Sequence, residues 1–298
     1  MMNTIWSENV QGIKTLYLTR QLRFDDLFFA QYEKLFDLDK NAPLKILEIG
    51  CGPGALALAL HRWYPKAQIT AIDRDSNFIS FAKANCPEIN FLEGDATELP
   101  FEENTFDITI SNTVQEHVEP AAFWGEQLRV LKKGGVCLCL STRKGIYCTA
   151  PCLEQTEEEK EFLSALPDFQ EELKKYEVCQ FPMTEAELPA SMEANGFTNV
   201  TTGYAVINLT PDSPEYSKQF AEKIIEANRQ VALETVECAR SVDKIKRKAA
   251  ASAINKKYDE RLALFHAGKK QWNTSVTITM VVRGISGWNY SDMLIQFV

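Results

Sequence analysis

The residues best suited to chemistry lie in a glycine-rich turn and in the polar segments that follow it. Gly50, Cys51, Gly52 and Gly54 come directly after an apolar run and precede a second apolar sequence at 55–60. Glycine lacks a Cβ, so a ligand can lie against the backbone, and the start of a helix offers unpaired N–H groups to that ligand. This strand–turn–helix pattern predicts a cradle for a nucleotide-like ligand.

An aspartate and a histidine follow two later strands. Asp73 ends an apolar strand, and in two-layered α/β nucleotide folds such a carboxylate accepts hydrogen bonds from both ribose hydroxyls. The alternative is that Asp73 only caps a helix. His117 titrates near neutrality and is a candidate general base, with Glu116 or Glu119 to orient it. The alternative is that His117 only lines a cleft or caps the next helix.

Strands and helices alternate along the first half of the chain, which predicts an α/β fold with a doubly wound parallel sheet. Two further strands are expected near 199–209 and 274–282, the latter at a sheet edge. An amphipathic aromatic helix is predicted over 21–37. The five strands of the alternating region are predicted at 44–49, 67–73, 89–93, 106–112 and 136–142.

The bulk numbers restrict the function. The chain has 298 residues, 45% of them hydrophobic and 24% charged, as in an ordinary globular protein. A net charge of −9 disfavours binding to phosphate backbones, so no nucleic-acid partner is expected. The eight cysteines do not resemble a disulfide framework and indicate a reducing compartment. No leader or membrane-spanning stretch is recognised, so we expect a cytoplasmic protein that makes no membrane contact.

Two cysteines lie in a C-x₃-C arrangement. Cys148 and Cys152 follow the predicted fifth strand, with Cys179 as a distant third thiol. Soft metals or metalloids favour thiolate ligands, but two cysteines without a well-spaced partner make a weak metal signal. We therefore predict that these cysteines are structural and that the protein holds no metal.

The order of these motifs resembles the class I S-adenosylmethionine-dependent methyltransferases, in particular those acting on small molecules. The resemblance covers about residues 44–142 and, more weakly, 184–210 and 274–283. It implies a Rossmann-like doubly wound seven-stranded sheet with an antiparallel last strand. The matching segments are Leu47–Gly54, Asp73, Gly94–Ala96, Ser111–Asn112 with Gln115–His117, and Leu131–Gly135.

The resemblance also implies roles for individual residues toward S-adenosylmethionine. Glu48 and the glycine turn are expected near the methionine end of the donor, and Asp73 at the ribose hydroxyls. Asp95 and Ala96 are expected at the adenine, with Arg74 stacking on it or bordering it. The Asn112 carbonyl is expected to receive the donor's ammonium, with Thr113 beside it. The predicted donor-binding residues are thus Glu48, Gly50, Cys51, Gly52, Gly54, Asp73, Arg74, Asp95, Ala96, Asn112 and Thr113.

The remaining segments are assigned by the same resemblance. Residues 41–142, 183–210 and 271–298 are expected to form the donor-binding core, and 1–40 an N-terminal helical cap. The insertions 143–182 and 211–270 both leave the sheet at its carboxyl edge, so we expect a helical lid over the acceptor. The alternative is that they pack only on one another or form a homodimer interface.

Three functions fit these motifs. The first is transfer of a methyl group by in-line displacement to an oxygen or nitrogen of a small organic acceptor. The second is a non-catalytic sensor or assembly protein that binds the donor or a related nucleoside. The third is an NAD(P)-dependent oxidoreductase, because Gly50–Ala55 also fits a dinucleotide fingerprint. Glu48, the extra Gly54 and Gly94-Asp95 favour the methyltransferase.

Overall fold

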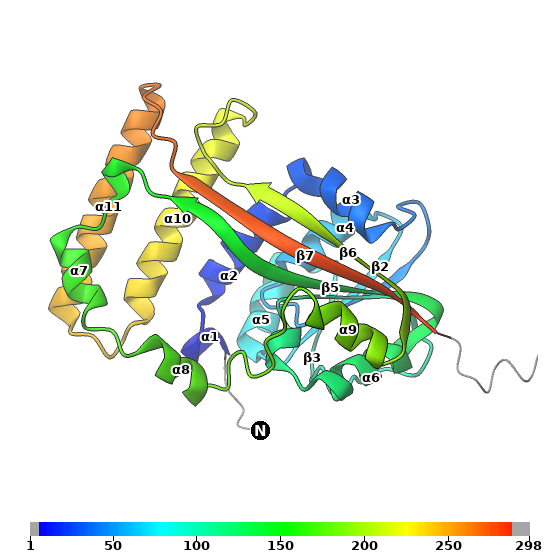
Figure 1. Cartoon of the computed structure of the whole chain (residues 1–298). Coiled ribbons are helices and arrows are strands. Elements are labelled where there is room, and N and C mark those ends of the chain that lie inside the picture. The colour runs from blue at the N-terminus through cyan, green and yellow to red at the C-terminus, as the bar shows by residue number, and fades with distance from the viewer. Residues whose placement is uncertain (1–5, 288–298) are drawn as a thin grey trace, which may run out of the picture. The chain divides into compact units, whose positions relative to one another are not determined.

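The structure is a computed structural model, and it describes residues 6–287 (Figure 1). Seven strands form one sheet in the order β3-β2-β1-β4-β5-β7-β6, which confirms the predicted seven-stranded α/β fold. The strands are β1 (Lys45–Ile49), β2 (Gln68–Asp73), β3 (Asn90–Glu93), β4 (Phe106–Asn112), β5 (Leu131–Cys148), β6 (Phe197–Asn208) and β7 (Thr274–Ser286).

Helices and 3₁₀ turns connect these strands. They are α1 (Trp6–Asn9), α2 (Ile13–Arg23), η1 (Asp26–Phe28), α3 (Phe29–Phe36), α4 (Ala55–Trp63), α5 (Ser76–Asn85), η2 (Gln115–His117), α6 (Pro120–Val130), η3 (Pro151–Leu153), α7 (Glu157–Leu163), α8 (Phe169–Lys175), α9 (Glu187–Ala194), α10 (Lys218–Cys238) and α11 (Lys244–His266).

Strands β1 to β5 form the parallel part of the sheet. β1 pairs with β2 on one side and with β4 on the other, both in parallel register. Ile46, Leu47 and Ile49 of β1 are fully buried, because helices cover both faces of a parallel sheet. The carboxyl ends of β1, β2 and β4 therefore meet at one edge.

Strand β7 runs antiparallel to β6. The Leu209 N–H donates to the Ser275 carbonyl at 2.8 Å, and the Thr198 hydroxyl donates to the Ile285 carbonyl at 3.3 Å. As the residue numbers rise along β6, the numbers of the residues that face them on β7 therefore fall. The predicted antiparallel last strand is confirmed, although it lies between β5 and β6 rather than at the edge of the sheet.

The N-terminal aromatic segment is not the single helix predicted over 21–37. Helix α2 ends at Arg23, and Asp25 accepts a hydrogen bond from the Leu27 N–H at 3.2 Å, which starts the separate turn η1. Asp25 has extended backbone dihedral angles, as a helix-capping residue does. The periodic aromatics are buried as predicted, but an aspartate within them breaks the helix.

Strand β5 starts five residues earlier than predicted and ends six residues later. Gly134 and Gly135 lie within the strand, since α6 ends at Val130. The β4–β5 register shifts in this region, and Gly134 adopts φ +74°. A Cβ on Gly135 would lie 2.7 Å from the Lys132 carbonyl oxygen. The two glycines therefore permit a bulge inside the strand.

The chain divides into two compact units. The core unit contains residues 24–143, 177–205 and the chain from Ile278, and the helical unit contains the chain up to Arg23 with 144–176 and 206–277. Residues 1–5 of the predicted cap and 288–298 of the predicted core lie outside the described residues.

Helices α10 and α11 lie side by side in the helical unit, with α7 against α11 and α2 against α10 (Figure 1). Phe162 of α7, Val236 of α10 and Ile254 of α11 belong to one buried apolar cluster. A capping box of Thr156 and Glu159 starts α7. The amphipathic faces of these helices thus bury a small core of their own.

A buried ion pair lies at the end of α11. The Arg261 guanidinium, which is fully buried, donates to Asp212 Oδ2 at 2.7 Å and to Asn273 Oδ1 at 2.7 Å. Asp212 Oδ2 also accepts the N–H groups of Gln271 and Trp272. One carboxylate therefore neutralises the arginine and holds the turn between α11 and β7.

Glu234 of α10 caps the first turn of α2. Its carboxylate accepts the Lys14 N–H at 3.1 Å, the Thr15 N–H at 2.6 Å and the Thr15 hydroxyl. A Cβ on Gly12 would lie 2.3 Å from the carboxyl carbon of Glu234. The unpaired N–H groups of α2 are thus satisfied by a residue far along the chain.

Candidate active site

The glycine turn joins β1 to α4 and is held by backbone hydrogen bonds. The N–H groups of Gly50 and Cys51 donate to the Ile72 carbonyl of β2 at 2.8 and 3.0 Å. Gly50, Gly52 and Gly54 have φ values of +68°, +51° and +85°, which side chains disfavour. The turn therefore needs glycine at each of these positions.

The three glycines differ in what surrounds them. A Cβ on Gly50 would lie 2.4 Å from Val114, and one on Gly54 would lie 2.9 Å from Phe91. A Cβ on Gly52 would meet no heavy atom of residues 6–287 within 4 Å, apart from its own chain neighbours. Gly50 and Gly54 thus allow close packing within the protein, whereas Gly52 borders open space that a ligand can enter.

Asp73 stands beside this open space. Its Oδ2 accepts the Gly52 N–H at 2.7 Å, and its Oδ1 accepts the Asp75 N–H at 2.9 Å. These two backbone N–H groups orient the carboxylate. Each of its oxygens can still accept a further hydrogen bond. Burial raises the pKa of Asp73 to about 6; these N–H groups and Arg74 oppose the rise, and the charge of Asp75 adds to it.

Glu48 is the most buried acid of the turn. It is 2% exposed, and its Oε2 has no hydrogen-bond partner among residues 6–287. Burial raises the pKa of Glu48 well above its ordinary value, the Asp73 charge adds to the rise, and the Ala57 N–H of α4 opposes it. Burial also raises the pKa of the Cys51 thiol, so Cys51 stays neutral.

The loop after β3 is tied to the end of β2. The Gly94 N–H donates to the Asp73 carbonyl at 3.0 Å. Asp95 Oδ1 accepts both the N–H and the hydroxyl of Thr97, each at 2.7 Å. Asp95 is exposed and Ala96 half-buried, so the structure places both predicted adenine residues in an ordered turn next to Asp73.

The end of β4 supplies Asn112 and Thr113. Asn112 is paired with Leu140 of β5, and the Thr113 N–H donates to the Leu140 carbonyl at 2.8 Å. Thr113 has φ +55°, so the chain turns sharply there and leads Val114 against Gly50. Arg74 is exposed at the end of β2, and its charge acts on both Asp73 and His117.

His117 is held by a segment that the sequence assigns to an insertion. Its Nδ1 accepts the Cys179 N–H at 3.0 Å. The Phe181 N–H donates to the Glu116 carbonyl at 2.9 Å, and Gln115 Nε2 donates to the Phe181 carbonyl at 3.0 Å. Sequence reasoning did not connect these residues, because backbone N–H groups leave no signature in the residue types.

The protonation of His117 follows from this contact. Burial, and then the charge of Arg74, lower the pKa of the imidazole to about 4, so it is neutral at pH 7. A neutral imidazole that accepts at Nδ1 carries its proton on Nε2. The Glu116 side chain is half-buried, and its backbone contacts Phe181.

A family model described as a methyltransferase domain matches residues 47–139. A demethylmenaquinone methyltransferase of Staphylococcus aureus is 32% identical over 192 residues, which cover 58% of this chain and 78% of that protein. This chain belongs to the class I S-adenosylmethionine-dependent methyltransferases.

Two other proteins resemble the methyltransferase. A fatty-acid O-methyltransferase of Mycolicibacterium smegmatis is 29% identical over 172 residues, covering 48% of this chain and 62% of that protein, so the match spans less than two thirds of that relative. The structure of Haemonchus contortus phosphoethanolamine N-methyltransferase 2 with S-adenosyl-L-methionine has a TM-score of 0.53 at 15% identity, covering 97% of this chain and 60% of that chain. This last likeness concerns the fold.

The residues of the turn fit the donor of this family. Gly52 faces open space, Asp73 has spare acceptor capacity, and Glu48 has a buried oxygen without a partner. A ligand with hydroxyl groups and positive charge would satisfy these acceptors. The site therefore suits S-adenosylmethionine.

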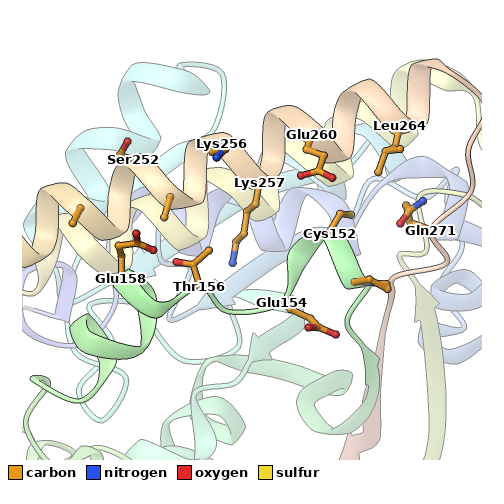
Figure 2. A pocket seen from close by; sticks show the side chains of 13 residues that line it. Cys152, Glu154, Thr156, Glu158, Ser252, Lys256, Lys257, Glu260, Leu264 and Gln271 are labelled. Atoms are coloured by element: carbon orange, nitrogen blue, oxygen red, sulfur yellow. The ribbon is translucent and has the colours of Figure 1, made fainter.

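A groove of about 760 Å³ lies in the helical unit of the methyltransferase. Figure 2 shows Lys257 and Glu260 of α11 along one side and Cys152, Glu154 and Thr156 along the other. Charges of both signs line it, so they select no ligand class. Among residues 6–287, no group of three or more histidine, cysteine or acidic residues is arranged to hold a metal.

None of the helices in the described part of the methyltransferase is long and apolar enough to cross a bilayer.

Proposed function

We propose that the protein transfers a methyl group from S-adenosylmethionine to an oxygen or nitrogen of a small organic acceptor. The observation that carries this proposal is the open space at Gly52, bordered by the oriented carboxylate of Asp73. The bound donor supplies an electrophilic methyl group on a sulfonium. The chain's own residues bind and align the reactants and exclude water.

The donor-binding roles proposed here follow the placement of each residue. Asp73 accepts the ribose hydroxyls, and Asp95 with the Ala96 N–H faces the adenine, bordered by Arg74. Glu48 and the glycine turn receive the methionine end, with Asn112 and Thr113 at the end of β4. The ends of β1, β2 and β4 that carry these residues lie at the carboxyl edge of the sheet, where α/β folds bind nucleotides.

A small acceptor is proposed from the relatives and the insertions. The matched proteins are named for a fatty acid and for demethylmenaquinone, which are small molecules. For this chain, we propose that residues 143–182 and 211–270 form a helical lid on the acceptor, with 1–40 as a cap. Protection of 211–270 from protease that increases with S-adenosylhomocysteine plus acceptor would support a closing lid.

We propose that His117 holds the segment at Cys179 in position and does not transfer a proton. Its Nδ1 is occupied by the Cys179 N–H, and a pKa of about 4 makes it a weak base. His117→Asn can still accept this N–H, whereas His117→Ala cannot. We expect Asn to retain turnover within about tenfold and Ala to lose more, while donor binding persists in both.

The pH profile of turnover separates the two roles of His117. The pKa is lowered on folding, so the neutral imidazole contributes stability above about pH 6.5 that is lost as the pH falls toward 4. Turnover of the folded enzyme should therefore show no histidine ionisation between pH 6 and 8. An equal loss of about 100-fold in both variants would instead identify a general base.

Asp73→Asn tests the proposed donor site. The amide replaces one carboxylate oxygen with a donor and removes the charge, so binding of S-adenosylhomocysteine should weaken by roughly 10- to 100-fold. Calorimetry measures the affinity, and Glu103→Gln, at an exposed turn, is the control. Failure of the wild-type protein to bind either S-adenosylhomocysteine or S-adenosylmethionine would refute the proposed function.

Family membership overturns the NAD(P)-dependent oxidoreductase. A non-catalytic sensor would bind the donor through the same residues, so transfer of a labelled methyl group to a metabolite pool must be measured. The cytoplasmic location, the lack of nucleic-acid partners and a homodimer through the insertions remain predictions, supported by cysteine content, a charge of −9 and the helical insertions.

A further inference from the structure

We propose that Glu48 carries a proton in the unliganded protein and releases it when the cationic donor binds, so that the site prefers the sulfonium donor to its uncharged thioether product. This inference rests on the proposed function, because it takes S-adenosylmethionine as the ligand of the glycine turn. Glu48 is then a specificity-determining residue for the donor.

The first observation is the isolation of the carboxyl group. Glu48 is 2% exposed, and its Oε2 has no hydrogen-bond partner among the described residues. In the sheet it is level with Ala71 of β2 and Ile110 of β4, which are apolar. Because this oxygen has no protein partner among residues 6–287, the protonated acid costs less to bury than the carboxylate.

The second observation is a neighbouring carboxylate. Ala71 is level with Glu48, so Asp73, two residues further along β2, projects from the same face of the sheet. The Asp73 oxygens accept the N–H groups of Gly52 and Asp75, which hold its negative charge in place. The negative charge of Asp73 therefore disfavours ionisation of the neighbouring Glu48.

The groups that act on Glu48 come from every side of the turn. Asp73 and burial favour its protonated form, Cys51 is a neutral thiol, and the Ala57 N–H at the start of α4 favours the ionised form. Within residues 6–287, no basic side chain forms an ion pair with Glu48. In the described part of the chain, the negative charge of Glu48 is therefore not neutralised by a basic side chain.

The donor supplies the missing positive charge. S-adenosylmethionine carries one more positive charge, at its sulfur, than S-adenosylhomocysteine does. When the donor binds, the O–H bond of the Glu48 carboxyl breaks, the proton passes to the buffer, and the carboxylate remains with the bound cation. The product lacks the sulfonium charge and therefore stabilises the ionised carboxylate less, so Glu48 takes up a proton again. The protein consequently binds the product more weakly than the donor.

Calorimetry in two buffers of different ionisation enthalpy measures the proton directly. At pH 7.5, Asp73, with a pKa of about 6, is only about 3% protonated and contributes little. We expect a measurable release of protons with S-adenosylmethionine and distinctly less with S-adenosylhomocysteine. Binding of S-adenosylmethionine without proton release would overturn the inference and leave the proposed function intact, whereas absence of binding would refute the function itself.

Glu48→Gln is the matched variant, because glutamine resembles the protonated acid in shape and stays neutral. We expect it to fold, to release no proton, and to lose roughly tenfold in its preference for S-adenosylmethionine over S-adenosylhomocysteine. Glu103→Gln, at an exposed turn, should keep both properties of the wild type. Proton release that persists in Glu48→Gln would assign the proton to another group and contradict the proposal.

Discussion

Gly52→Ala is expected to weaken donor binding by roughly 100-fold or more while leaving the fold largely intact. The new methyl group would project into the open space at Gly52, where no other atom of the described chain beyond the neighbouring residues lies within 4 Å. The residue also has φ +51°, so alanine costs about 1–2 kcal/mol of strain. Calorimetry with S-adenosylhomocysteine measures the affinity, and urea unfolding measures the strain.

Gly134→Ala is the matched control for Gly52→Ala. Gly134 has φ +74° and also meets no heavy atom within 4 Å, but it lies in the bulge of β5. Its substitution should cost the same strain and leave donor affinity unchanged. Equal affinities in Gly52→Ala and the wild type would show that the ligand does not enter the space at Gly52.

Asp212→Ala is expected to destabilise the protein by about 3–5 kcal/mol, because it leaves the buried Arg261 without a counter-charge. The N–H groups of Gln271 and Trp272 also lose their acceptor. Urea unfolding followed by circular dichroism measures the loss. Such a loss is a large fraction of the stability of a typical domain.

Two further variants test whether the buried charge of Arg261 causes this loss of stability. Arg261→Met combined with Asp212→Ala removes the unpaired charge and should recover part of the lost stability. Glu33→Ala breaks an exposed ion pair with Lys40 and should cost less than about 1 kcal/mol. A cost for Asp212→Ala no larger than that of Glu33→Ala would contradict the importance of the buried pair.

The sequence predicts the central strands well because their signal is local. β1 to β4 are apolar runs bounded by turn residues, and the structure places them within a few residues of the predictions. The extension of β5 to Cys148 was not predicted, because 143–148 is polar or exposed and has no strand periodicity. Its first residues were missed because Gly134-Gly135 resembles a helix stop.

Part of the candidate site could likewise be predicted from the sequence and part could not. The spacing of the motifs predicts that Gly52 and Asp73 belong to the site, and in the structure a hydrogen bond of 2.7 Å joins them. The contact between His117 and Cys179 joins residues 62 positions apart through a backbone N–H, which sequence patterns do not encode. The differing surroundings of Gly50 and Gly52 also depend on Val114, whose position only the folded chain determines.

The capping of α2 by Glu234 has a consequence for synthesis on the ribosome. Lys14 donates to a carboxylate 220 positions later in the chain. At about 5–20 residues per second, the ribosome needs roughly 10–45 s to make that interval. During this time the nascent α2 lacks its cap, and its apolar residues have no α10 to pack against. The docking of α2 on α10 therefore comes late, only after the ribosome has made α10.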